Sequence, residues 1–140
     1  MTGAARITRY CVVDDFGTVI NPMLLKGQIH GGVVQGAGQA LMEDIVYEAG
    51  TGQQLTASFM DYAMPRADDF PDFTVESMPT PTKANAIGAK GAGEAGTVGA
   101  LPAVISAICD ALSPYGIHHI EMPATPMRVW QALKDAGAYD

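Results

Sequence analysis

The sequence predicts an α+β domain of mixed strands and helices, without a regular strand–helix–strand repeat. Short segments rich in β-branched and aromatic residues favour strands. Between them lie longer segments in which apolar residues recur every three or four positions, as in helices. No proline-, glycine- or serine-rich linker divides the chain. We therefore expect residues 1–140 to form a single domain.

In the first part of the chain, residues 6–14 are expected to form a strand, because they are rich in β-branched and aromatic side chains. Asn21 and Pro22 are typical of a helix start, as N-cap and first helical residue. Helical spacing then continues over residues 23–47. The segment 45–56 contains a glycine-bearing turn between two short apolar runs, which predicts a hairpin.

Prolines and glycines separate the elements expected further along the chain. Residues 65–72 are polar and bounded by prolines, so we expect an exposed loop. Alternating apolar residues predict a strand over 73–78, and helical spacing predicts a helix over 101–112. A short strand is expected at 117–122. Thr125 and Pro126 then begin a last helix, which ends near Ala136.

The charge balance excludes several classes of protein. The chain has 8 Lys and Arg against 15 Asp and Glu, a net charge of −7, which disfavours nucleic acid and anionic membrane surfaces. No apolar run approaches the ~18–20 residues of a membrane span, and the first residues lack the apolar stretch of a secretory signal. Cys11 and Cys109 are too few for a disulfide framework. We expect a cytoplasmic protein.

A first glycine cluster lies in the helix expected over residues 23–47. Gln28, Gly32, Gln35 and Gln39 are four, three and four residues apart, so they share one helix face. Interior glycines cost about 0.5–1 kcal/mol each relative to alanine, which tertiary contacts must offset. One interpretation is that a flat heterocycle lies against this face and hydrogen-bonds to the amides. The other is close packing against another element, with the glutamines facing solvent.

A second glycine cluster, residues 91–96, has the spacing G-x-G-x-x-G. No convincing strand precedes it, and the Glu94 carboxylate would repel a pyrophosphate, so we reject a dinucleotide-binding loop. The P-loop pattern also fails, because no Gly-Lys-Ser/Thr follows. Two interpretations of Glu94 remain: a general base on a tight loop before an apolar helix, or an exposed acid in a plain connector.

Acidic and histidine pairs do not predict a metal site. Residues 14–15, 68–69 and 118–119 lack companion ligands at a suitable spacing, and turns or solvated surface explain them. His30 is interpreted as an ordinary, partly buried histidine. We therefore expect no residue of this chain to ligate a metal directly.

Two stretches together resemble a known family. The stretch VVDDFGTVINPMLLKGQIHGGVVQGAGQALMEDIVYEAGTGQQLTASFMDYAMPRADDFP and the stretch GAKGAGEAGTVGALPAVISAICDAL follow in this order. They resemble the C-terminal part of the molybdopterin-binding large subunit of molybdenum hydroxylases. This family includes xanthine dehydrogenase, aldehyde oxidase and aerobic carbon monoxide dehydrogenase, and the carbon monoxide dehydrogenase type is most similar. The resemblance covers about residues 6–134.

The resemblance implies a role for each glycine cluster. It places Glu94 where the family has its active-site glutamate, the base in oxidation of a carbon centre with water-derived oxygen. Gln35 matches the glutamine that contacts the pterin cofactor. Lys90, Gly91, Ala92 and Gly93 match the loop backbone that approaches the metal site. The implied cofactor is molybdenum-molybdopterin, in some members as the cytosine dinucleotide, while iron–sulfur clusters and FAD lie on partner subunits.

The chain departs from the family in length, because large subunits run to several hundred residues. We therefore expect a fragment-like, C-terminal cofactor-binding region that needs the upstream half of the subunit and is inactive alone. Apolar surface left uncovered predicts a homo-oligomer of the isolated chain. One alternative stays open: a non-catalytic interaction or scaffold module derived from that subunit. A small nucleotide-binding domain that uses the loop 91–96 is a weaker alternative, for which we expect no measurable dinucleotide binding.

Overall fold

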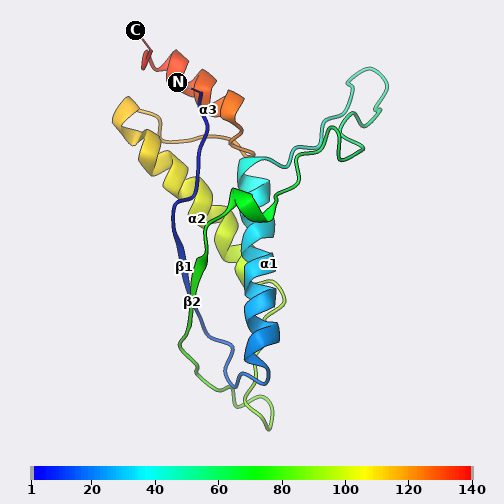
Figure 1. Cartoon of the computed structure of the whole chain (residues 1–140), viewed down its shortest axis with the longest axis vertical. Helices are drawn as coiled ribbons and strands as arrows, with labels where there is room; N and C mark the ends of the chain where they lie inside the picture. Colours follow the sequence, from blue (N-terminus) through cyan, green and yellow to red (C-terminus); the bar gives the residue numbers. More distant parts are fainter. Residues whose placement is uncertain (1, 140) are drawn as a thin grey trace.

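The computed structural model describes residues 2–139 and confirms a mixed arrangement of helices and strands (Figure 1). Its elements, in chain order, are β1 (Tyr10–Asp14), α1 (Pro22–Leu41), β2 (Phe73–Ser77), α2 (Ala95–Leu112) and α3 (Pro126–Asp135). Single 3-10 turns occur at Ala67–Asp69 and Ser113–Tyr115. The two long helices α1 and α2 cross each other, and the two strands run beside them.

Strands β1 and β2 form a two-stranded parallel sheet, in which Tyr10 pairs with Phe73 and Asp14 with Ser77. Parallel strands need a crossover connection, and α1 supplies it. The chain thus contains one strand–helix–strand unit, followed by helices alone. One face of the sheet packs on the helices through a cluster centred on Phe16, Ile29 and Val33.

Glycines allow the backbones of α1 and α2 to approach closely. A Cβ atom on Gly36 would lie 2.7 Å from the Thr97 carbonyl oxygen, and one on Gly96 would lie 2.6 Å from the Ile29 carbonyl oxygen. Real Cβ atoms do not come so near, so any larger residue would push the helices apart. Close packing between α1 and α2 therefore explains Gly32, Gly36 and Gly96. For the first cluster this agrees with the second interpretation, close packing against another element.

A second apolar cluster joins the upper half of α2 to α3 and the connection between them. It contains Val104, Ile108, Leu112, Ile120, Ala124, Val129 and Leu133. The Ala124 N–H donates to the Ala40 carbonyl at 2.7 Å, which ties this region to the end of α1. Thr125 caps α3 by accepting from the Arg128 N–H at 3.3 Å, as predicted.

Several predicted boundaries were wrong. The first strand is restricted to Tyr10–Asp14 rather than residues 6–14. Helix α1 ends at Leu41 rather than near residue 47, because the N–H groups of Met42 and Glu43 both donate to the Gly38 carbonyl and close the helix. Helix α2 begins at Ala95, earlier than the expected 101, and its Gly96 packs on α1.

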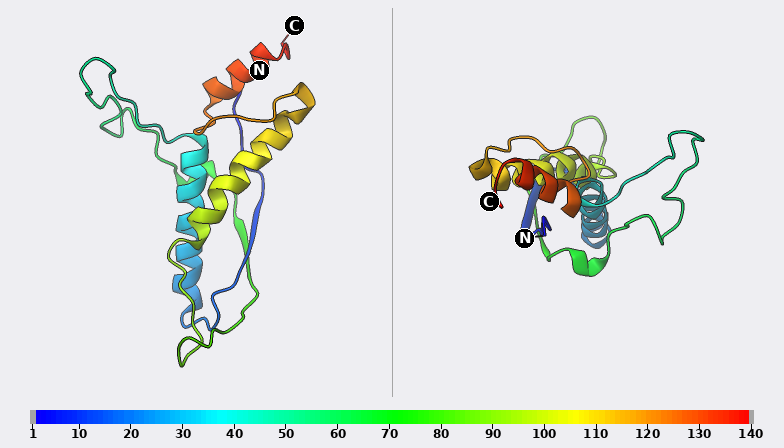
Figure 2. Two further views of the ribbon diagram at one scale, coloured as in Figure 1. Left: turned by 180° about the vertical axis from the view of Figure 1, so that it is seen from behind. Right: turned by 90° about the horizontal axis from the view of Figure 1, so that it is seen from above.

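Of the two other predicted β elements, one is absent and one is short. Residues 117–122 form no strand and instead run as an irregular connection with a bend at Met122. The predicted hairpin is present but short: Tyr47 and Gln54 form an antiparallel bridge, and the Glu48 and Leu55 N–H groups donate to the Gln53 and Val46 carbonyls, both at 2.8 Å. It belongs to a long excursion, residues 42–64, which we call the arm. The arm projects away from the helices in two views (Figure 1, Figure 2).

One described helical segment is long and apolar enough to cross a membrane. It covers Ala95–Tyr115, with a mean hydropathy of 1.6, contrary to the expectation that no such segment exists. Length and composition cannot distinguish a membrane span from the core helix of a soluble protein. Here the segment packs on α1 and on the α3 region.

Candidate functional site

The two glycine clusters lie beside each other at the crossing of α1 and α2. Gln28 Nε2 donates to the Gly93 carbonyl at 2.8 Å. The Thr97 hydroxyl donates to Gln35 Oε1 at 3.2 Å. Gln28 and Gln35 therefore border the segment that carries Glu94, although the two clusters are more than sixty residues apart in sequence. Gln39, the last residue of the predicted stripe, is exposed nearer the end of α1.

Glu94 is the N-cap residue of α2 and its side chain is exposed. The side chain makes no capping hydrogen bond, so the carboxylate is free to face a ligand. The first turn of α2 leaves backbone N–H groups without intrahelical acceptors, and the helix dipole makes this end positive. The loop and the two glutamines thus present amide donors and acceptors around one carboxylate.

The loop before Glu94 is open on one side and packed on the other. Gly91 and Gly93 have no neighbour where a Cβ atom would lie, so a ligand can reach the backbone there. Ala92 instead packs against the apolar cluster that contains Phe16 and Ile29. The Lys90 N–H is already used, because it donates to the Phe16 carbonyl at 2.9 Å. Gly91 and Gly93 therefore offer the most accessible backbone.

A charged contact anchors the start of this loop. Lys90 Nζ lies 2.5 Å from Asp15 Oδ2. The hydrogen bond from Lys90, together with those from the Thr80 and Gly17 N–H groups, holds the pKa of Asp15 well below its usual range. Sequence reasoning assigned Asp15 only to a turn and missed this contact. The Asp-x-Gly turn was visible, but nothing local indicates a partner 75 residues away.

Residues 2–139 contain no group of three or more His, Cys, Asp and Glu side chains placed to hold a metal ion. His118 and His119 are exposed. His30 is half-buried, and its ring meets the edge of Phe73 with centroids 5.3 Å apart. This arrangement agrees with its interpretation as a packed histidine.

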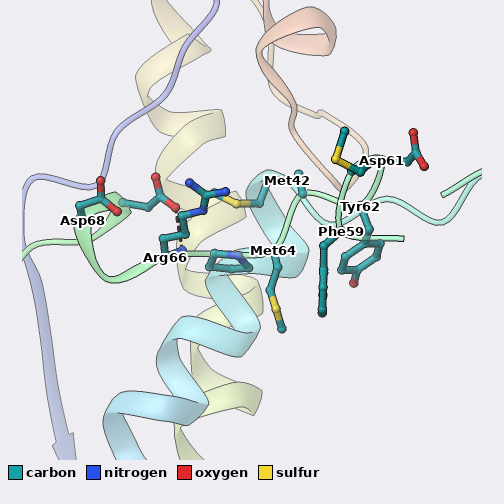
Figure 3. A pocket seen from close by; sticks show the side chains of 11 residues that line it. Met42, Phe59, Asp61, Tyr62, Met64, Arg66 and Asp68 are labelled. Carbon is teal, nitrogen blue, oxygen red and sulfur yellow. Dashed lines mark hydrogen bonds between the residues drawn. The ribbon is translucent and has the colours of Figure 1, made fainter. Parts of the chain in front are cut away.

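A cavity of about 540 Å³ lies at the opposite end of α1, at the base of the arm (Figure 3). Met42, Phe59, Tyr62, Met64 and Arg66 contribute to its lining. The Tyr62 hydroxyl donates to the Glu43 carboxylate, and this hydrogen bond raises the pKa of Tyr62. The cavity includes neither Glu94 nor Gln35, so it is distinct from the glycine-rich face.

Comparison with known proteins tests the family resemblance found in the sequence. The model of the molybdopterin cofactor-binding domain family matches residues 1–71. The chain belongs to this family. The chain is 43% identical, over 96% of its length, to the nicotine 6-hydroxylase large subunit of Paenarthrobacter nicotinovorans. It is 39% identical to the carbon monoxide dehydrogenase large chain of Hydrogenophaga pseudoflava, again over 96% of its length.

Solved structures have the same fold. Carbon monoxide dehydrogenase from Oligotropha carboxidovorans matches 99% of this chain with a TM-score of 0.94 and 37% identity. Quinoline 2-oxidoreductase from Pseudomonas putida matches 96% with a TM-score of 0.88 and 38% identity. The predicted α+β class and the family resemblance are thereby confirmed. The chain covers only 16–17% of the large subunits and solved chains named here.

Proposed function

We propose that this chain is part of the molybdenum-cofactor-binding catalytic subunit of a molybdenum hydroxylase, and that Glu94 is its general base. The observation that carries the proposal is the pair of hydrogen bonds from Gln28 to Gly93 and from Thr97 to Gln35. They hold the Glu94 segment against the amide-bearing face of α1. Such a face suits a heterocycle with mixed donors and acceptors.

The residues of this face fit a molybdopterin. Gln35 would hydrogen-bond to the pterin through its amide, and the backbone of Lys90, Gly91, Ala92 and Gly93 would approach the metal end. The open space at Gly91 and Gly93 supports this placement. The cofactor's cytosine dinucleotide form is the version we propose. When bound, the molybdenum centre supplies two-electron oxidation of the substrate carbon.

Glu94 would accept the proton released when water-derived oxygen is added to that carbon. Its carboxylate is exposed and makes no capping bond, so it can accept a proton without first breaking a contact within the loop. A carboxylate placed within hydrogen-bond reach of the reacting group typically contributes about 10²–10⁴-fold to the rate. The reaction class is carbon monoxide, aldehyde or heterocycle oxidation.

The chain would need partners for a complete cycle. We propose that residues 1–140 act as one fragment-like unit beside the remaining part of a large subunit. Iron–sulfur and flavin subunits would then carry the electrons away, in the cytoplasm. This proposal is supported by the relatives, which are named as large subunits and are about six times longer than the matched segment. The isolated chain is expected to be inactive.

The test is Glu94→Gln in the complex purified with this chain as the bait. Turnover should fall by about two to four orders of magnitude, while molybdenum content stays normal. Glu121→Gln, an exposed carboxylate in the 117–122 connection, is the matched control and should leave turnover unchanged. Unchanged turnover in Glu94→Gln would remove Glu94 from the mechanism.

The exposed apolar side chains of the arm favour a second candidate, a non-catalytic interaction module derived from the same subunit. Phe59 is 80% exposed and Met60 is 93% exposed. Patches of this kind mark surfaces that another chain covers. A native pull-down separates the candidates: a larger subunit with molybdenum supports the enzyme, and a metal-free homo-oligomer supports the module.

A further inference from the structure

The Asp15 carboxylate joins three parts of the chain that are distant in sequence. Its Oδ2 accepts from Lys90 Nζ at 2.5 Å, and its Oδ1 accepts from the N–H groups of Gly17 and Thr80, both at 2.8 Å. An exposed ion pair usually joins two mobile side chains and contributes little. Here two of the three donors are backbone groups, so the carboxylate restrains the backbone itself.

The segment that ends at Lys90 is also paired with the turn after β1. This pairing consists of an antiparallel bridge between Gly17 and Ala89, a hydrogen bond of 3.0 Å from the Thr18 N–H to the Gly88 carbonyl, and one of 2.9 Å from the Lys90 N–H to the Phe16 carbonyl. The Lys90 side chain then reaches back to Asp15. Both the backbone and the side chain of Lys90 are therefore fixed, four residues before Glu94.

A second anchor lies on the other side of the loop. Gln28 holds the Gly93 carbonyl, and Gly96 is packed against α1. Only Gly91 and Ala92 separate the two anchors. Glycine has more conformational freedom than any other residue, so a glycine-rich loop keeps one shape only if its ends are held. The position of Glu94 thus depends on both anchors.

We propose that Asp15 is a positioning residue for the Glu94 loop: by holding Lys90 and the connection at Thr80, it fixes the backbone from which Glu94 is presented. The inference rests on the proposed role of Glu94 and deepens it. Asp15 acts through Lys90 and is not itself a catalytic residue. The ion pair with Asp15 also occupies the Lys90 ammonium, so this ammonium does not pair with the nearby Glu94 carboxylate instead.

The test is amide hydrogen exchange on the 140-residue chain carrying Asp15→Asn. This change keeps the side-chain shape and removes the charge that holds Lys90. Exchange at the Lys90 and Val98 amides, which donate to the Phe16 and Glu94 carbonyls on either side of the loop, should rise about tenfold or more, while the middle of α2 stays as protected as in the wild type. Lys90→Met should have the same effect, and Lys90→Arg should keep most of the protection because it retains the charge.

A matched control is available at the other end of the molecule. Asp44 pairs with Arg128 at 3.3 Å, and these side chains are 38% and 39% exposed, against 33% for Asp15 and 36% for Lys90. Asp44→Asn should leave exchange at the Lys90 and Val98 amides unchanged. Wild-type exchange there in both Asp15→Asn and Lys90→Met would overturn the proposal. So would an equal rise along all of α2, which would indicate global destabilisation.

In the purified complex, Asp15→Asn should lower kcat at unchanged molybdenum content and with KM within about twofold, since a misplaced base weakens the transition state more than substrate binding. Lys90→Arg should retain the kcat that Lys90→Met loses. The exchange experiment needs neither molybdenum nor turnover. A failure of Glu94→Gln would therefore overturn the proposed function, whereas a flat exchange profile would overturn the positioning role alone.

Discussion

The two ends of α1 differ in how their surroundings are held. At its N-terminal half, the turn after β1, the Lys90 segment and the Glu94 loop are joined by long-range hydrogen bonds and by a glycine-lined helix crossing. At its C-terminal end, the arm has an isolated bridge and exposes Phe59 and Met60. The first region takes its shape from contacts within the chain, and the second presents apolar surface for contacts outside it.

The strongest way to break this comparison is at the helix crossing. Gly96→Val should destabilise the fold by at least about 3 kcal/mol, because the new side chain would collide with the Ile29 carbonyl oxygen. Gly99→Ala on the same helix meets no neighbour and should stabilise by about 0.5–1 kcal/mol. Thermal unfolding followed by circular dichroism measures both. A Gly96→Val protein as stable as wild type would show that the crossing is not tightly packed.

Substitutions in the arm should change self-association rather than the stability of the fold. Phe59→Ser combined with Met60→Ser should reduce self-association of the isolated chain, because both side chains are largely exposed. The free energy of unfolding of this double variant should differ from that of the wild type by no more than about 0.5 kcal/mol. Light scattering over a range of concentrations measures the association. Met127→Ser, an exposed apolar residue of α3, is the control; if it has the same effect, or if the wild type is already monomeric, the arm has no special role.

A smaller effect is expected at the start of α1. The Asn21 side chain accepts from the Leu24 N–H at 3.1 Å, so Asn21→Ala should lower the free energy of unfolding by about 1 kcal/mol. Thr125→Ala at the start of α3 is the parallel change. Urea denaturation of both variants gives the comparison. No loss in Asn21→Ala would mean that the cap is not formed in solution.

The smallest effect concerns pH. The folded-state pKa of Asp15 lies below its ordinary value of 3.8, so its contribution to stability is present above that value and is lost as pH falls through the lower folded-state pKa. The stability difference between wild type and Asp15→Asn should therefore stay constant from pH 7 to pH 5 and shrink only below about pH 4. Thermal midpoints at several pH values measure it; a difference that disappears by pH 5 would contradict the assignment.

Local signals predicted local structure well. Asn21 and Thr125 cap their helices as expected, because a cap depends on neighbouring residues alone. Helix periodicity identified three helices and placed α3 correctly, but it misplaced the end of α1 and the start of α2. The end of α1 depends on the Gly38 carbonyl and its bonds to Met42 and Glu43. The prediction of a strand at 117–122 was wrong, because β-branched residues form a strand only where another strand pairs with them, and these residues pair with none.

The candidate site was only partly visible in the sequence. Helical spacing placed Gln28 and Gln35 on one face, and their contacts with Gly93 and Thr97 bear out that face. The glycines Gly32 and Gly36 proved to serve helix packing, which spacing alone could not separate from ligand contact. The Asp15–Lys90 pair could not be predicted, because long-range pairing leaves no local pattern.

The central claim is tested most directly by measuring molybdenum content and turnover together in two variants of the purified complex. We predict that Glu94→Gln keeps its molybdenum and loses turnover, because the proposed role of Glu94 is to accept a proton. Gln35→Ala should lose molybdenum, because the proposed role of Gln35 is to bind the pterin. Full turnover in Glu94→Gln, or full molybdenum content and turnover in Gln35→Ala, would contradict the claim that this face forms the cofactor site.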